Sequence, residues 1–152
     1  MKTKILLGLL LIGLLACDKD ESIDCCVNID TYIDLRLQDA DGHNLLEGDQ
    51  AWTTGDIQVY HHLEDGWEIS TNNLMIIERE SENCLRFFAS EEIVADNISE
   101  TKLILPEVEE GIFKTELSNT GSSLIMNSLW YNDVLLWEIT DSSDRFFTLT
   151  VQ

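Results

Sequence analysis

Apolar and polar residues alternate in several segments of the chain. Over residues 33–37, Ile33, Leu35 and Leu37 fall on one side of an extended backbone, whereas Asp34 and Arg36 fall on the other. A period of two residues is typical of a half-buried β-strand. The same period recurs as far as the C-terminal segment. It predicts strands at residues 33–37, 57–63, 67–69, 74–78, 84–89, 102–105, 112–117, 124–131, 134–139 and 146–151.

Turn-forming residues separate these segments. Glu64-Asp65-Gly66 separates residues 57–63 from residues 67–69 and predicts a hairpin. Asn132-Asp133 predicts a tight hairpin, because Asn and Asp tolerate the left-handed backbone angles that a two-residue loop requires. In that register Trp130 opposes Leu135, and we expect Trp137 on the same face.

Many short strands joined by turns predict an all-β fold. The chain has a single proline and no long amphipathic segment. We expect an antiparallel β-sandwich, immunoglobulin-like or related, and the alternative is a small β-barrel. Residues 90–100 are the one segment where we expect a turn or two of helix.

The N-terminus has the layout of a cleaved signal peptide. Lys2 and Lys4 precede an uncharged apolar run over residues 5–16. A helix of that length reaches about 18 Å, short of the roughly 30 Å hydrocarbon core of a bilayer. A general signal peptidase prefers a small residue three positions before the cut, and Leu14 stands there.

Leu14-Leu15-Ala16-Cys17 resembles the lipobox of bacterial lipoproteins. The resemblance implies cleavage before Cys17, a diacylglyceryl group on its thiol and commonly an acylated amine. Two or three acyl chains anchor a protein durably. The alternative is an ordinary cysteine at the end of a general signal. We therefore divide the chain into a signal peptide (1–16), an acidic tether (17–30) and a single β-rich domain (31–152).

Asp18-Lys19-Asp20-Glu21 follows the lipobox cysteine directly. A lysine among acidic residues at this place resembles the surface-export signal of Bacteroidota lipoproteins, and this resemblance implies an outer-membrane protein that faces the cell exterior. An aspartate after the cysteine is linked in enterobacteria to inner-membrane retention, which is one alternative. The other is that these charges only solvate a flexible tether.

A second resemblance rests on three longer stretches. "IDLRLQDADGHNLLEGD", "IQVYHHLEDG" and "LWYNDVLLWE" look like a recurring type of small surface lipoprotein of Bacteroidota. These stretches are turns and strands. The resemblance therefore implies an extracytoplasmic β-domain, and it carries over no functional residue.

The chain is strongly acidic. The chain has nine basic and 29 acidic residues, and removal of residues 1–16 takes away Lys2 and Lys4, which leaves a formal charge of −22. The negative electrostatic field of such a chain repels phosphate backbones and anionic lipid headgroups. We expect no nucleic-acid partner and no membrane contact besides the lipid anchor.

Three cysteines remain once Cys17 is acylated. An odd number leaves at least one thiol unpaired. A disulfide from Cys25 or Cys26 to Cys84 is one possibility, with Cys26–Cys84 as the named pair, and three reduced thiols are the other. The cysteines and histidines lack the paired spacing of a zinc site.

Enzyme motifs are missing from the sequence. It contains no Gly-x-Ser-x-Gly, no His-Glu-x-x-His and no phosphate-binding glycine loop. Among the histidines, His43, His61 and His62, we expect His61 to share a face with Ile57 and Val59 and to be in the core or half-buried, and His62 to be exposed. The run Glu107, Glu109 and Glu110 predicts a solvated acidic loop, with acid-base chemistry as the alternative. We expect no enzyme activity and no cofactor.

Two further groups are candidates for binding. Asp39, Asp41 and Asn44 surround Gly42 and faintly resemble a calcium loop, but the spacing departs from the EF-hand and also suits an ordinary turn. The tryptophans suit either a sugar-stacking surface or the core; they are Trp52, Trp67, Trp130 and Trp137.

The whole sequence favours a lipid-anchored envelope protein that acts as a non-catalytic binding or assembly module. Its partner is an unidentified protein or glycan. The alternatives are a structural subunit of a surface appendage, which accepts a neighbour by strand addition, and a hydrolase that uses carboxylates.

Overall fold

The computed structural model describes residues 28–71, 73–106, 108, 110–140 and 144–151. Over these residues the chain is all-β, as predicted, and contains no helix. The strands are β1 (Asn28–Asp30), β2 (Tyr32–Gln38), β3 (Gln58–Leu63), β4 (Gly66–Ile69), β5 (Leu74–Arg79), β6 (Glu82–Phe88), β7 (Ile98–Ile104), β8 (Gly111–Asn119), β9 (Ser123–Tyr131), β10 (Val134–Glu138) and β11 (Phe146–Thr150).

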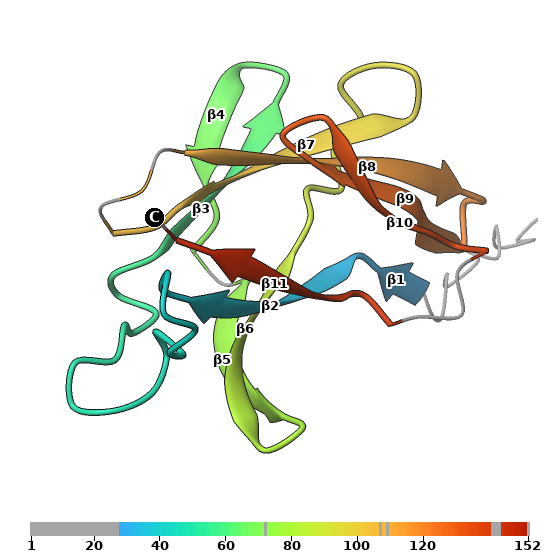
Figure 1. Cartoon of the computed structure of the whole chain (residues 1–152). Coiled ribbons are helices and arrows are strands. Elements are labelled where there is room, and N and C mark those ends of the chain that lie inside the picture. Colours follow the sequence, from blue (N-terminus) through green and yellow to red (C-terminus); the bar gives the residue numbers. More distant parts are fainter. Residues whose placement is uncertain (1–27, 72, 107, 109, 141–143, 152) are drawn as a thin grey trace, which may run out of the picture.

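The strands form two sheets (Figure 1). The larger sheet has the order β1-β9-β8-β7-β3-β4, and β10 also pairs with β9; the smaller sheet has the order β11-β2-β6-β5. Two edge pairs are parallel, β1 with β9 and β11 with β2. A purely antiparallel arrangement is therefore wrong at these edges. Parallel neighbours are distant in sequence, so local alternation carries no information about their direction.

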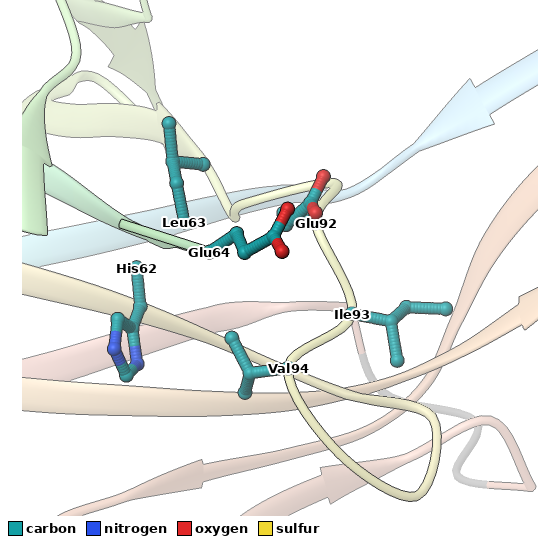
Figure 2. A pocket seen from close by; sticks show the side chains of 6 residues that line it. All are labelled: His62, Leu63, Glu64, Glu92, Ile93 and Val94. Carbon is teal, nitrogen blue, oxygen red and sulfur yellow. The ribbon is translucent and has the colours of Figure 1, made fainter. Parts of the chain in front are cut away.

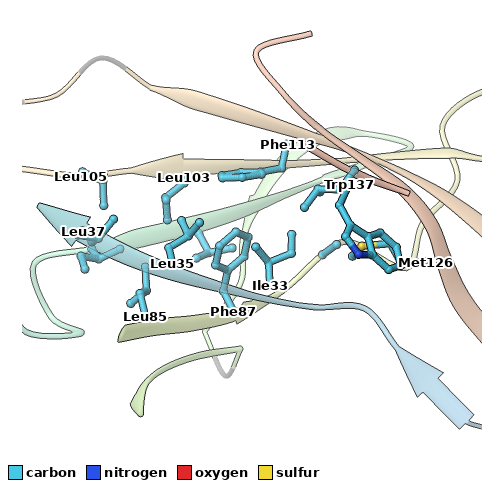
Figure 3. Close-up of a cluster of buried hydrophobic side chains, with 14 of the residues drawn as sticks. Ile33, Leu35, Leu37, Leu85, Phe87, Leu103, Leu105, Phe113, Met126 and Trp137 are labelled. Carbon is cyan, nitrogen blue, oxygen red and sulfur yellow. The ribbon is translucent and has the colours of Figure 1, made fainter. Parts of the chain in front are cut away.

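The hydrophobic core lies between the two sheets (Figure 3). Ile33, Leu35 and Leu37 of β2 point inward together with apolar residues of β6 and of the larger sheet. Phe87 of β6 meets Phe113 of β8 edge to face, with ring centroids 5.2 Å apart. Full burial of such a side chain contributes about 1.5–3 kcal/mol. This contact joins the two sheets directly.

The predicted helical turns at residues 90–100 are absent. A tight turn at Asp96-Asn97, with φ of 47° and 67°, leads instead into β7, which begins at Ile98. Ser99 and Thr101 are the first inward-facing residues of β7, and both are fully buried. Because these inward positions carry hydroxyl groups, the apolar alternation that would reveal the strand is missing.

The predicted hairpin at Asn132-Asp133 is confirmed. Both residues have positive φ, 46° and 66°, and Trp130 lies opposite Leu135. The predicted orientation of Trp137 is wrong. The register shifts between Leu135 and Trp137, and this bulge turns Trp137 to the inner face opposite Leu129, where it is 8% exposed.

A buried carboxylate ties the strands of the smaller sheet together on its outer face. Asp34 of β2 is fully buried. Arg86 of β6 donates two hydrogen bonds of 2.7 Å to it, and Arg79 of β5 donates one of 2.8 Å. The hydrogen bond with Asp34 raises the pKa of Arg86. We call Asp34, Arg79 and Arg86 the Asp34 clasp.

The clasp also reaches the fourth strand of this sheet. The Arg79 guanidinium lies over the ring of Phe146 on β11, 4.9 Å from its centroid. A cation over an aromatic face is attracted by the ring quadrupole. Asp34 and its two arginines therefore connect all four strands.

Replacing the central carboxylate should strongly destabilise the domain. Asp34→Ala leaves two partly buried guanidinium groups without their shared partner, and we expect the free energy of unfolding to fall by about 3–5 kcal/mol. Urea denaturation followed by tryptophan fluorescence measures this change. The matched variant Glu82→Ala removes a more exposed ion pair with Arg36 and should cost at most about 1 kcal/mol. Equal losses of unfolding free energy in the two variants would contradict a stabilising role of the Asp34 clasp.

His61 connects the two sheets through a polar contact. Its Nε2 atom on β3 lies 3.1 Å from the carbonyl oxygen of Phe88 on β6, so the ring donates a hydrogen bond to that oxygen. Burial lowers the pKa of His61, although the Phe88 carbonyl and Glu91 act in the opposite direction. The folded state therefore favours the neutral ring, in agreement with the predicted half-buried position.

The lowered pKa of His61 gives stability a defined pH dependence. As the pH falls through the usual range of histidine, the unfolded chain binds a proton before the folded chain does, so the free energy of unfolding falls. We expect His61→Gln to lose less stability than the wild type between pH 8 and pH 5. Urea titrations across this range measure the difference. A His61→Gln profile parallel to the wild type would refute the explanation.

Candidate functional site

A continuous row of side chains crosses the outer face of the larger sheet. Glu100 of β7 lies opposite Lys114 of β8, Lys114 lies opposite Trp130 of β9, and Trp130 lies opposite Leu135 of β10. His62 of β3 extends the row, because its Nδ1 atom is 2.9 Å from the Glu100 carboxylate. We call these five residues the outer row. Four strand spacings give it a length of about 19 Å.

Trp67 of β4 covers the His62 end of this row. Its indole stacks on the His62 ring at a centroid distance of 4.7 Å, and Lys102 Nζ lies 4.5 Å from its centre. This cover makes His62 half-buried, so the predicted exposure of His62 is wrong. Much of the Trp67 ring is thus already in contact with neighbouring side chains.

Trp130 lies near the other end of the row, opposite Leu135. It lines a hollow of about 210 Å³ together with Ile98, Lys114 and Asp133. Lys114 Nζ lies 2.5 Å from an Asp133 carboxylate oxygen, and this hydrogen bond raises the pKa of Lys114. Within the described ranges no aromatic ring or cation stacks on Trp130. An apolar ring bordered by charges of both signs is suited to a ligand with an apolar face and polar edges.

A second hollow, of about 400 Å³, lies beside His62 (Figure 2). Glu64 from the β3–β4 turn and Glu92 from the loop before β7 line it, together with the apolar Leu63, Ile93 and Val94. Among the described residues, only Asp39, Asp41 and His43 bring three potential metal ligands together. Glu64, Glu92 and His62 therefore do not form a group of three potential metal ligands.

The calcium candidate has the geometry of a turn. Asp39, Asp41 and His43 place ligand atoms within 4.8 Å of one another. The Asp39 carboxylate accepts hydrogen bonds from the backbone nitrogens of Asp41 and His43, and the bond from His43 lowers its pKa. The Asn44 side chain is engaged elsewhere: it donates to the Asn83 carbonyl and accepts from the Leu46 nitrogen. Asn44 is therefore not brought together with Asp39 and Asp41 as a ligand.

The remaining candidates are dispersed. Glu110 pairs with Lys102 at 3.1 Å, whereas Glu107 and Glu109 lie outside the described residues. Trp52 packs against the core and Trp137 lies within it. Of the four tryptophans, only Trp67 and Trp130 remain candidates for the outer face. Sequence reasoning missed Ile98 and Lys114, which only strand register brings to Trp130, and Glu100, which register brings to Lys114.

Of the four cysteines, only Cys84 lies within the described residues. Cys17, Cys25 and Cys26 lie outside the described residues. Cys84 is a buried free thiol on β6, and burial raises its pKa. The Cys26–Cys84 disulfide and the lipid on Cys17 therefore stay predictions.

No helix in the described part of the chain is long and apolar enough to cross a membrane. Comparisons with protein-family models, with curated proteins and with solved structures find no match to this chain. The functional proposal therefore rests on the chain's own residues and their arrangement.

Proposed function

We propose that this chain is a lipid-anchored protein of the outer membrane that faces the cell exterior. Its β-rich domain acts as a non-catalytic binding module. The lipobox resemblance of Leu14-Leu15-Ala16-Cys17 supports the anchor. The acidic residues around Lys19 support a location on the outer surface of the cell. The formal charge of −20 on the whole chain supports attachment through lipid rather than through basic side chains.

We propose further that the domain is a β-sandwich, immunoglobulin-like or related, rather than a small barrel. The support is that the described strands divide into two separate sheets and the buried apolar residues come from both. Within the described residues, β11 and β5 each have an unpaired edge, which also favours an open sandwich, because closure into a barrel would pair these edges.

The outer row is the proposed binding surface, and the observation that carries this proposal is that no described aromatic ring or cation stacks on Trp130. The indole offers a flat apolar surface, Ile98 adds an apolar wall, and Lys114 and Asp133 offer a donor and an acceptor beside it. The apolar face of a sugar ring packs on an aromatic ring while its hydroxyl groups need polar partners at the edge. A glycan is therefore the proposed ligand.

The distribution of lysines also favours this face. Beyond Lys19 the chain has only two lysines, Lys102 and Lys114, and both occupy outward positions of the larger sheet. They reduce the local negative field in an otherwise acidic protein. Lys102 and Lys114 therefore place two cationic hydrogen-bond donors on this face.

The anchor proposal is tested in cells. Cys17→Ser removes the thiol that receives the lipid, so we expect the protein to leave the membrane fraction and appear in the soluble fraction. Fractionation with immunoblotting measures the distribution, and mass spectrometry of the wild-type N-terminus should show an acylated Cys17. As a control, Cys84→Ser should stay in the membrane fraction. Full membrane retention of Cys17→Ser would disprove the anchor.

The binding proposal is tested on the chain from Asp18 onward. We expect it to bind a subset of glycans on an array, and we expect Trp130→Ala to weaken affinity for them about tenfold or more, through loss of stacking. Calorimetry with the selected glycan measures the affinity. Trp67→Ala, whose ring is already covered, should lose less. An array without binding, or an unchanged affinity in Trp130→Ala, would reject a glycan site at this position.

A further inference from the structure

The smaller sheet has an unprotected edge at β5. This strand, Leu74–Arg79, pairs with β6 alone. No backbone hydrogen bond joins β5 to any other strand of the described chain. Its outward-directed amide and carbonyl groups are therefore available to a further strand.

The sequence of β5 lacks the usual protection of an edge strand. Leu74, Met75, Ile76 and Ile77 are four consecutive apolar residues, and Met75 is 39% exposed. Natural edges are commonly blocked by lysine, by proline or by an inward-pointing charge. In β5 the charges come only at the end, at Glu78 and Arg79. The first four residues are thus suited to pairing with an extended chain.

A hollow of about 310 Å³ lies beside the start of this edge. Leu74 of β5 and Ile69 of β4 both line it, so it opens where the two sheets separate. Its apolar wall includes the core residues Ile57 and Val59, which are nearly fully buried. Its polar lining consists of Thr54, Gln58, Ser70 and Thr71.

None of the residues that line this hollow is charged, although charged residues make up 25% of the chain. The other two hollows each contain ionisable groups, Glu64 and Glu92 in one and Lys114 and Asp133 in the other. Burying an unpaired charge against Ile57 and Val59 is costly. The hollow therefore selects an uncharged apolar group.

We propose that the free edge of β5 and this uncharged hollow form one docking site for an extended peptide segment of a partner protein. The segment adds to the smaller sheet as a further strand through backbone hydrogen bonds. Because alternate side chains of a strand point to opposite faces, one inward side chain of the segment enters the hollow and meets Ile57 and Val59. The segment must carry an uncharged apolar residue at that position.

The charge of the chain favours a separate partner over a second copy. Pairing two β5 edges would bring together two bodies that each carry a formal charge of −22 once residues 1–16 are removed, and their repulsion opposes association. A neutral or basic segment meets no such repulsion. The docking site also lies at the β4 end of the larger sheet, whereas Trp130 lies on β9 near the other end, so this inference does not depend on the glycan site.

The site is tested with a defined peptide and the chain from Asp18 onward. The probe is acetyl-Lys-Thr-Val-Thr-Val-Thr-Lys-amide, and the control is the same peptide with proline as its central residue, which removes a backbone donor. We expect the probe, and not the control, to slow amide hydrogen exchange in β5 and to shift the NMR signals of Ser70 and Thr71. Unchanged exchange in β5, or protection confined to β4 or β11, overturns the proposal.

A pair of variants tests the hollow itself. Thr71→Glu places a charge at the polar lining of the hollow and should weaken probe binding about tenfold or more. Thr148→Glu adds the same charge on the exposed part of β11, the opposite edge, and should leave binding unchanged. Equal affinity in the two variants rejects the hollow as the anchor point. Size-exclusion chromatography that shows a dimer without peptide, with β5 protected, rejects a separate partner in favour of a second copy.

Discussion

Packing of the two inner faces against each other is the interaction on which the rest of the structure depends. Once Phe87 meets Phe113 and the inward residues of β2 fill the space between the sheets, the alternation of each strand is set. The remaining side chains must then stand on the outer faces. The Asp34 clasp on one outer face and the outer row on the other both follow from this division. A register slip of one residue in β2 would dismantle the clasp, and one in β7 would dismantle the outer row.

Much of the fold follows from local pattern, and the exceptions have physical causes. The alternation around Ile33 and the Asn132-Asp133 turn could be predicted because both signals are contained in a few adjacent residues. The start of β7 could not be predicted, because its inward residues Ser99 and Thr101 are polar. The orientation of Trp137 is reversed by a β-bulge, and no residue type in the sequence indicates this bulge. The structure also pairs Asn28–Asp30 with β9, in a segment that the sequence assigns to the tether.

The candidate site could be predicted only in part. Trp67 and Trp130 were named from their residue type, but nothing local distinguished them from the tryptophans of the core. Lys114 and Ile98 belong to other strands and reach Trp130 only through the pairing of β7, β8 and β9, which also brings Glu100 opposite Lys114. Residues brought together by pairing between strands distant in sequence cannot be recognised from one sequence without the register.

The parallel pairing of β1 with β9 has a mechanical consequence for a tethered protein. β9 carries Trp130, and β1 is the first described strand after the proposed anchor at Cys17. Tension between a ligand held at Trp130 and the membrane would pass from β9 to the adjacent β1 through a short ladder of hydrogen bonds loaded in shear. The force would then not cross the apolar core, so tension on the ligand would not separate the two sheets.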